Sequence, residues 1–251
     1  MSAPNAPAWL TARPIAHRGL HDKTAGIVEN TVSAAQAAIV RGYAVECDVQ
    51  LTADGEAVVF HDATTGRLLQ TGAVVAEASA AFLAALAFKS GADHVPTLAH
   101  FLAAIGGRVP LICEIKSGFD GDMRLTDRAL AVGAAYAGPL AFKSFDPAVI
   151  AHLRALRADQ PLGIVAERRY DDPEWDFLGA TRKFELSNFL HFPQTRPDFL
   201  SFWIEDLPSA VPLLCRAGLG LPVMSWTIRT KEQQEKARLW ADQIVFEGLQ
   251  L

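Results

Sequence analysis

Short segments rich in β-branched residues alternate with Ala- and Leu-rich segments of helical length along the whole chain. The candidate strands are Pro14–His17, Tyr43–Asp48, Val109–Lys116, Pro139–Ser144, Pro161–Ala166, Phe199–Ile204, Leu221–Thr227 and Gln243–Glu247. The candidate helices are Thr31–Arg41, Leu98–Ile105, Leu125–Tyr136, Pro147–Arg157, Pro173–Leu190, Pro208–Ala217 and Lys231–Trp240. This alternation predicts an α/β fold in which eight parallel strands close into a (β/α)8 barrel, a fold of about 250 residues. The chain has 251 residues.

A further strand is predicted at Ala57–His61, directly after the Asp54-Gly55 turn signal. If it forms an antiparallel hairpin with the second strand, His61 lies opposite Glu46. We therefore interpret it as a small hairpin insertion after strand two, covering about residues 49–95. The alternative is an open doubly wound sheet, but no glycine-rich dinucleotide turn follows the first strand.

Composition restricts the partners and the setting. The net charge is −5 and basic runs are absent, so nucleic acid is not expected. Three cysteines without zinc-site spacing favour a reduced, cytoplasmic location. Residues 1–14 show no secretory signal and no apolar run is long enough to span a bilayer, so no stable membrane anchor is expected. No linker is evident, so residues 1–251 are predicted to form one domain, whose oligomeric state the sequence leaves open.

Charged side chains are predicted to meet at the C-terminal ends of neighbouring strands. Alternate residues of a strand share a face, so Glu46 and Asp48 project together, as do Glu114 and Lys116 on the next barrel strand. Barrel enzymes keep their active sites at this end. Three inward carboxylates repel one another unless they share protons or hold a cation. Because oxygen ligands favour hard ions, we predict that Glu46, Asp48 and Glu114 bind one divalent cation, Mg²⁺ or Ca²⁺.

The charges of this site indicate a small anionic substrate. Arg18 and Lys116 do not fully offset the three carboxylates, and a divalent ion makes the site positive, which suits a phosphodiester. Arg18 is predicted to grip phosphate oxygens in fork geometry. His17 closes the first strand and His61 reaches the same rim through the hairpin. We therefore predict that the two imidazoles divide general-base and general-acid duties.

Eight segments match, in order, the motifs of one known family. They are Ile15–Gly19 (IAHRG), Glu29–Thr31 (ENT), Val45–Gly55 (VECDVQLTADG), Val58–Asp62 (VVFHD), Val95–Leu98 (VPTL), Glu114–Lys116 (EIK), Lys143–Pro147 (KSFDP) and Ser225–Ile228 (SWTI). The chain thus resembles the glycerophosphodiester phosphodiesterase family (GDPD) over nearly its whole length. The HRG and HD motifs with Glu-x-Asp between them form a specific combination. The resemblance implies a TIM barrel with a small insertion after strand two.

The resemblance also implies a hydrolase that cleaves glycerophosphodiesters to sn-glycerol 3-phosphate and an alcohol. It makes His17 and His61 the acid/base pair, Glu46, Asp48 and Glu114 the metal ligands, and Arg18 and Lys116 the phosphate-binding residues. In the family mechanism the glycerol 2-hydroxyl attacks phosphorus, and water then opens the cyclic phosphate. Such an intramolecular attack is favoured because the nucleophile is already tethered beside phosphorus. Which histidine acts first stays open.

Four other residues at family positions have less definite roles. Asn30 is predicted as the N-cap of the first helix. Glu29 is predicted to support the site beside the phosphate-binding arginine or the metal. Phe145 and Trp226 are predicted to line the substrate pocket next to the glycerol or alcohol group, with core packing as the alternative.

The chain departs from the family pattern near its end. Val245–Gly248 reads VFEG, where an Asp-bearing motif is usual, and Arg229 lies in a stretch where asparagine is common. We hypothesise that Arg229 favours a more anionic alcohol, so the preferred leaving group stays open. Two alternatives remain: a lipid phosphodiesterase of the sphingomyelinase D or lysophospholipase D kind, and a non-catalytic phosphate-binding barrel. The sequence shows no basic amphipathic helix, and a binding protein needs no acid/base pair, so soluble diesters are favoured.

Overall fold

The structure, a computed structural model, describes residues 6–251. Residues 1–5, part of the segment in which no secretory signal is predicted, lie outside the described residues. The strands are β1 (Ile15–Ala16), β2 (Ala44–Leu51), β3 (Ala57–Val59), β4 (Leu111–Ile115), β5 (Leu140–Ser144), β6 (Leu162–Ala166), β7 (Phe199–Trp203), β8 (Val223–Ile228) and β9 (Gln243–Phe246). The α-helices are α1 (Val32–Val40), α2 (Ala80–Ala85), α3 (Leu98–Ile105), α4 (Arg124–Ala134), α5 (Pro147–Ala155), α6 (Ala180–Ser187), α7 (Phe192–Thr195), α8 (Ala210–Leu213) and α9 (Lys231–Trp240).

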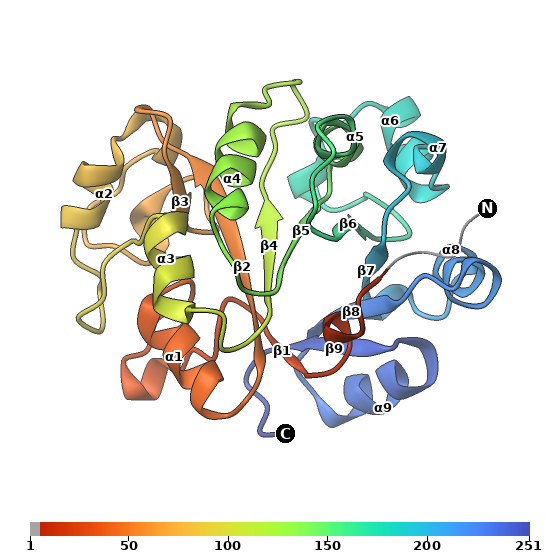
Figure 1. Cartoon of the computed structure of the whole chain (residues 1–251), viewed down its shortest axis with the longest axis horizontal. Coiled ribbons are helices and arrows are strands. Elements are labelled where there is room, and N and C mark those ends of the chain that lie inside the picture. Colours follow the sequence, from red (N-terminus) through yellow and green to blue (C-terminus); the bar gives the residue numbers. More distant parts are fainter. Residues whose placement is uncertain (1–5) are drawn as a thin grey trace.

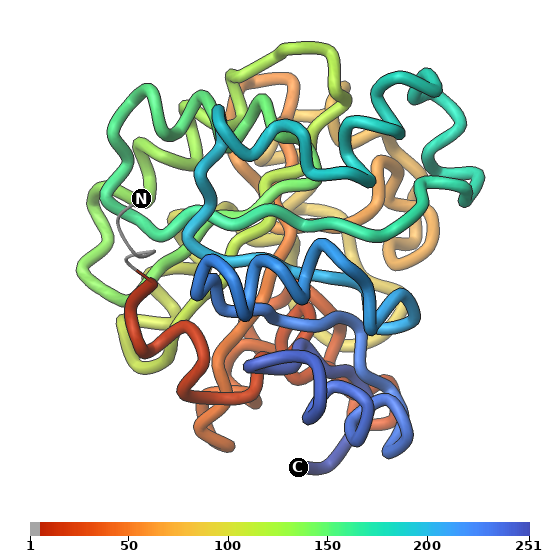
Figure 2. The backbone as a smooth tube through the Cα atoms, turned by 90° about the vertical axis from the view of Figure 1, so that its right-hand side faces the viewer, coloured from red at the N-terminus to blue at the C-terminus, as the bar shows by residue number. Residues whose placement is uncertain are grey.

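A closed ring of parallel strands forms the centre of the molecule. The sheet order is β1-β9-β8-β7-β6-β5-β4-β2-β3, and β1 also pairs in parallel with β2, which closes the ring. Only β3 is antiparallel; it pairs with β2 outside the ring. The helices surround the strands in Figure 1. In the view turned by 90°, the red first segments and the dark blue last segments of the chain lie together in the lower half (Figure 2), in keeping with the pairing of β1 with β9. The predicted (β/α)8 barrel with an additional strand is therefore confirmed.

The inside of the barrel changes from apolar to polar along the strands. A buried cluster fills its N-terminal end and includes Leu10, Ile15, Ala44, Ile112, Ala141, Phe199, Met224 and Val245. Two residues further along five of these segments, the sequence has His17, Glu46, Glu114, Lys143 and Glu247. Alternate residues share a face, so an apolar floor lies below a charged mouth. Cys47 and Cys113 take the other face and join the core between strands and helices.

The segment between β2 and α3 carries a second, smaller core. Figure 1 shows β3 and α2 on one side of the barrel, beside β2. The buried residues of this core are Val28, Val58, Phe60, Leu69, Val75, Ala78, Leu83, Phe88 and Val95. No helix was predicted at α2, which Ser79 caps by accepting a hydrogen bond from the Phe82 amide. Within residues 6–251, every helix is too short or too polar to bridge a bilayer.

The β2–β3 hairpin has a different register from the predicted one. Val49 pairs with Val59, and the Phe60 amide donates to the Asp48 carbonyl over 3.0 Å. The turn holds three residues, because the Thr52 amide donates to the Glu56 carbonyl. This extra residue shifts the pairing by one, so the prediction that His61 lies opposite Glu46 is wrong. His61 instead follows the residue that pairs with Asp48.

Two helix predictions also need correction. The N-cap of α1 is Thr31, whose hydroxyl accepts a hydrogen bond from the Ala34 amide, and not Asn30. Asn30 has a positive φ of 58°, which asparagine tolerates better than most residues. The predicted helix Pro173–Leu190 is shorter, because a single 3₁₀ turn at Pro173–Trp175 precedes α6.

Candidate active site

A cavity of about 380 Å³ opens at the C-terminal end of the barrel. Its charged lining consists of His17, Arg18, Asp48, His61, Glu114, Lys116, Lys143, Glu174 and Arg229. Its aromatic lining consists of Phe119, Phe145, Trp175, Phe177, Trp203 and Trp226. Two predicted site residues, Glu46 and Glu29, do not line this cavity, and they contact residues that do.

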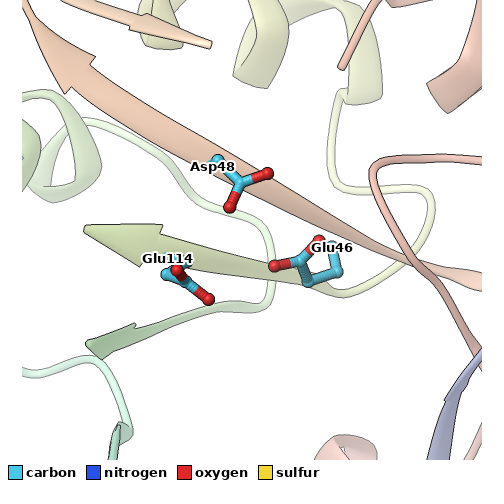
Figure 3. A group of neighbouring side chains, drawn as sticks. All are labelled: Glu46, Asp48 and Glu114. Atoms are coloured by element: carbon cyan, nitrogen blue, oxygen red, sulfur yellow. The ribbon is translucent and has the colours of Figure 1, made fainter. Parts of the chain in front are cut away.

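Three carboxylates converge beneath the cavity. Glu46 and Asp48 project from β2, and Glu114 projects from β4, where it is the register partner of Asp48 (Figure 3). One oxygen of each side chain lies within 4.8 Å of the others. The three residues are 0%, 1% and 5% exposed, respectively. The alternation predicted from Glu-x-Asp and Glu-x-Lys therefore does bring these acids together.

The cluster fits a hard cation. Ligand oxygens on opposite sides of a calcium ion lie about 5 Å apart, which the spacing of the three carboxylates matches. Glu46 is fully buried, and its Oε1 lies 3.0 Å from Lys143 Nζ. The residues present thus suit a divalent ion held by oxygen atoms alone.

Two lysines pair with the same carboxylates. Lys116 Nζ lies 2.9 Å from Asp48 Oδ1 and 2.5 Å from Glu114 Oε1. Lys143 Nζ lies 3.0 Å from Glu46 Oε1 and 3.2 Å from Glu114 Oε2. Burial raises the pKa of Asp48, but Lys116 and other nearby cations outweigh burial and hold that pKa well below its ordinary value. Asp48 therefore stays ionised.

Lys143 was missing from the predicted site. Its motif, Lys143–Pro147, was recognised, but no role was assigned to the lysine itself. A signal was present, because Lys143 lies two residues before Phe145, which was predicted to line the pocket, and therefore shares its face. Its register partner on β4 is Glu114. Asp48, Glu114 and Lys143 thus form one row across three strands.

Arg18 contacts both the acid cluster and Glu29, which lies just before α1. Its amide donates to Glu46 Oε2 over 3.1 Å, and its Nη1 donates to Glu29 Oε1 over 2.7 Å. Its Nε lies 3.4 Å from Asp48 Oδ2. The next residue, Gly19, has a φ of 79°, and a Cβ there would meet Ala34 at 2.7 Å. The HRG motif needs glycine at this position because the chain both turns and packs closely.

A chain of ion pairs connects Arg18 with His61. Glu29 accepts hydrogen bonds from Arg18 and from Arg67. The two hydrogen bonds from Arg67 are 2.7 and 2.8 Å long. Arg67 donates to Asp62, and Asp62 Oδ1 lies 2.8 Å from His61 Nδ1. Burial raises the pKa of Glu29, but hydrogen bonds from Arg67 and Arg18 outweigh burial and lower the pKa to about 2. Glu29 therefore lies beside Arg18, as predicted, and is ion-paired with both arginines.

His17 has a carboxylate partner that the sequence did not assign. Its Nδ1 lies 3.4 Å from Glu247 Oε2, at the end of β9, within the VFEG stretch. Arg229 donates to the same oxygen over 2.8 Å. The hydrogen bond from His17 is the largest of the effects that lower the pKa of Glu247 to about 2. Glu247 also offsets the charge of Arg229 at the mouth.

Aromatic rings form another part of the cavity wall. Phe145 and Trp226 meet edge to face, with ring centroids 5.6 Å apart, and Phe145 also lies 4.9 Å from Trp175. Trp226 Nε1 donates to the Ser201 carbonyl over 3.1 Å, which fixes the indole. Both predicted aromatic residues therefore line the cavity, and each also packs against neighbouring rings.

Comparison with known proteins agrees with this architecture. A phosphodiesterase from Oleispira antarctica, solved in complex with the product sn-glycerol-3-phosphate, superposes with a TM-score of 0.75 at 21% identity, covering 93% of this chain and 91% of the other. Glycerophosphodiester phosphodiesterases from Parabacteroides distasonis and Thermotoga maritima each give a TM-score of 0.69 at 22% identity. They cover 93% and 92% of this chain, respectively, and 92% of their own. At such identities these likenesses show the fold.

A search of curated proteins gave no significant match. The model of the glycerophosphoryl diester phosphodiesterase family matches residues 17–246, from the first histidine of the site to the end of the last strand. The chain belongs to the glycerophosphoryl diester phosphodiesterase family, and its enzyme class is that of the phosphoric diester hydrolases.

Proposed function

We propose that this chain hydrolyses soluble glycerophosphodiesters to sn-glycerol 3-phosphate and an alcohol, with one divalent cation, Mg²⁺ or Ca²⁺. The observation that carries the proposal is the shared cavity of His17, His61, Arg18 and Lys116 directly above the acid cluster. The product bound to the Oleispira antarctica relative, sn-glycerol-3-phosphate, supports the choice of substrate class.

In this proposal Glu46, Asp48 and Glu114 hold the divalent ion. When bound, such an ion supplies Lewis-acid stabilisation of the charge that develops on phosphate oxygens. Arg18 and Lys116 bind the remaining phosphate oxygens, since each presents charged donors at the cavity wall. The aromatic rings of Phe145 and Trp226 exclude water and pack against the carbon atoms of the substrate.

His17 and His61 divide the proton transfers. The Nδ1 atom of His17 faces Glu247 and that of His61 faces Asp62, so the Nε2 atoms are assigned to the substrate. His17 Nε2 lies 4.0 Å from Glu46 Oε2. One imidazole takes the proton from the glycerol 2-hydroxyl as it attacks phosphorus, and the other protonates the departing alcohol oxygen. A water molecule then opens the cyclic phosphate. No nucleophilic side chain of the protein is needed.

An activity screen tests this proposal. Purified protein is treated with EDTA and then assayed on glycerophosphocholine, -ethanolamine, -inositol and -glycerol with Mg²⁺ or Ca²⁺ added in turn. We expect release of glycerol 3-phosphate only after an ion is restored. Full activity after thorough chelation would exclude the role of the metal. Preference for lysophosphatidylcholine would favour a lipid phosphodiesterase, and binding without a single turnover would favour the non-catalytic barrel.

A further inference from the structure

Lys143 is a buried cation inside the acid cluster. The residue is 3% exposed, and its Nζ lies 3.0 Å from Glu46 and 3.2 Å from Glu114. Burial lowers the pKa of a lysine, but the two carboxylates outweigh burial and raise the pKa of Lys143. The ammonium group therefore stays charged at neutral pH.

With Lys143 included, the charges of the cluster balance. Three carboxylates face three cations: Arg18 beside Asp48, Lys116 between Asp48 and Glu114, and Lys143 between Glu46 and Glu114. The charge balance predicted from the sequence included only Arg18 and Lys116 among these cations. The described residues thus form a compensated cluster without any ion.

We propose that the ammonium group of Lys143 competes with the divalent ion for the carboxylates of Glu46 and Glu114. This inference rests on the proposed role of these acids as metal ligands. An ammonium group about 3 Å from two ligand oxygens repels a doubly charged ion placed on the same oxygens. The chain therefore holds its divalent ion weakly and exchanges it readily.

The geometry favours this role over a purely structural ion pair. A lysine that only balanced one acid could pair on the side away from the other ligands. Lys143 instead bridges two of the three acids and reaches the cavity wall. Glu46, whose Oε1 is the carboxylate atom nearest to Lys143 Nζ, is one of the proposed metal ligands. The ammonium group and the ion therefore bind to the same two carboxylates.

Equilibrium binding of Mn²⁺ to the full chain tests the proposal without any assay of activity. Lys143→Met removes the charge and keeps an unbranched side chain that is one atom shorter. We expect this variant to bind Mn²⁺ at least about tenfold more tightly than wild type, because even a well-screened charge at this distance has a large effect. Lys231→Met, at the exposed start of α9, is the matched control and should leave Mn²⁺ binding unchanged. Equal or weaker binding by Lys143→Met would overturn the proposal.

Thermal unfolding provides a second readout. Without the ammonium group the buried acids carry an uncompensated charge, which destabilises the fold. Lys143→Met and the polar variant Lys143→Gln should therefore melt below wild type in EDTA, and Mn²⁺ should raise their Tm more than it raises that of wild type. Failure of both variants to fold in saturating Mn²⁺ would also overturn the proposal, since the ion could then not replace the lysine. Hydrolysis by wild type after chelation bears on the proposed function alone.

Discussion

Asn30 and Asp48 hold each other through two hydrogen bonds. Asn30 Nδ2 donates to Asp48 Oδ2 over 3.0 Å, and the Asp48 amide donates to Asn30 Oδ1 over 3.2 Å. Asn30 is 2% exposed and reaches Asp48 because its backbone adopts a left-handed conformation just before α1. The asparagine of the ENT motif therefore orients a carboxylate of the acid cluster and does not cap the helix.

Asn30→Gly should weaken the site and keep the backbone conformation. Glycine accepts the positive φ of this position, so the variant removes only the amide that orients Asp48. Loss of a group that orients a metal ligand commonly costs tenfold or more in metal affinity or activity. We therefore expect kcat/KM to fall at least about tenfold, with a higher Mg²⁺ concentration needed for half-maximal rate. Asn30→Asp adds a repelling charge beside Asp48, so its kcat/KM should fall further than that of Asn30→Gly. Wild-type kinetics in Asn30→Gly would contradict the orienting role.

His17→Ala and His61→Ala should each lower turnover by at least about 10². Each variant removes a proton-transfer group from the cavity wall and leaves the core untouched. Circular dichroism should show unchanged melting, and His100→Ala, on the exposed face of α3, should retain full activity. A histidine whose removal costs less than tenfold does not belong to the acid/base pair.

Glu247→Gln should lower kcat about tenfold, with little change in KM. The carboxylate of Glu247 faces His17 Nδ1 and stabilises the imidazole as it takes up a proton, and an amide does this less well. Steady-state kinetics on one diester provide the measurement. Glu247→Asp restores the charge on a shorter side chain and should recover part of the loss. An unchanged kcat in Glu247→Gln would mean that Glu247, in the Val245–Gly248 stretch, does not assist His17.

The order of elements could be predicted from the sequence because apolar β-branched runs and helix starts repeat regularly. The predicted turn length and helix boundaries were wrong where the local sequence signals are ambiguous. Asp54-Gly55 indicates a tight turn but does not set its length, and one extra residue moved His61 relative to Glu46. The predicted helix Pro173–Leu190 contains apolar residues at helical spacing, yet Trp175 and Leu178 are buried in an aromatic cluster that forms without a continuous helix.

Within the acid cluster, the residues predicted by alternation are those that lie two positions apart in one strand. Glu46 with Asp48, and Glu114 with Lys116, share a face by alternation alone. Lys143 and Glu247 were assigned no role, because their partners come from other strands: Lys143 meets Glu114 through the β4–β5 register, and Glu247 meets His17 across 230 residues. The first pair depends on the register between β4 and β5 and the second on the pairing of β1 with β9, and the sequence shows neither.

Glu167 lies outside the proposed chemistry, at the C-terminal end of β6. It is 3% exposed, and its Oε1 has no hydrogen-bond partner among the described residues. Burial, followed by the nearby carboxylates of Glu174, Asp172 and Asp206, raises its pKa from the ordinary 4.5 to about 8. The folded protein therefore keeps this proton in a pH range where the unfolded chain has released it.

This difference makes wild type less stable as the pH rises from about 4.5 to about 8, because the folded state binds more protons there. Each pKa unit corresponds to about 1.4 kcal/mol. Glu167→Gln cannot ionise, so its Tm should exceed that of wild type by at least about 2 °C at pH 9, and the difference should shrink towards pH 4.5. Calorimetric scans across this range provide the test, with Glu235→Gln on the exposed face of α9 as control. Melting curves that run parallel to those of wild type at every pH would show that Glu167 is ionised in the folded protein.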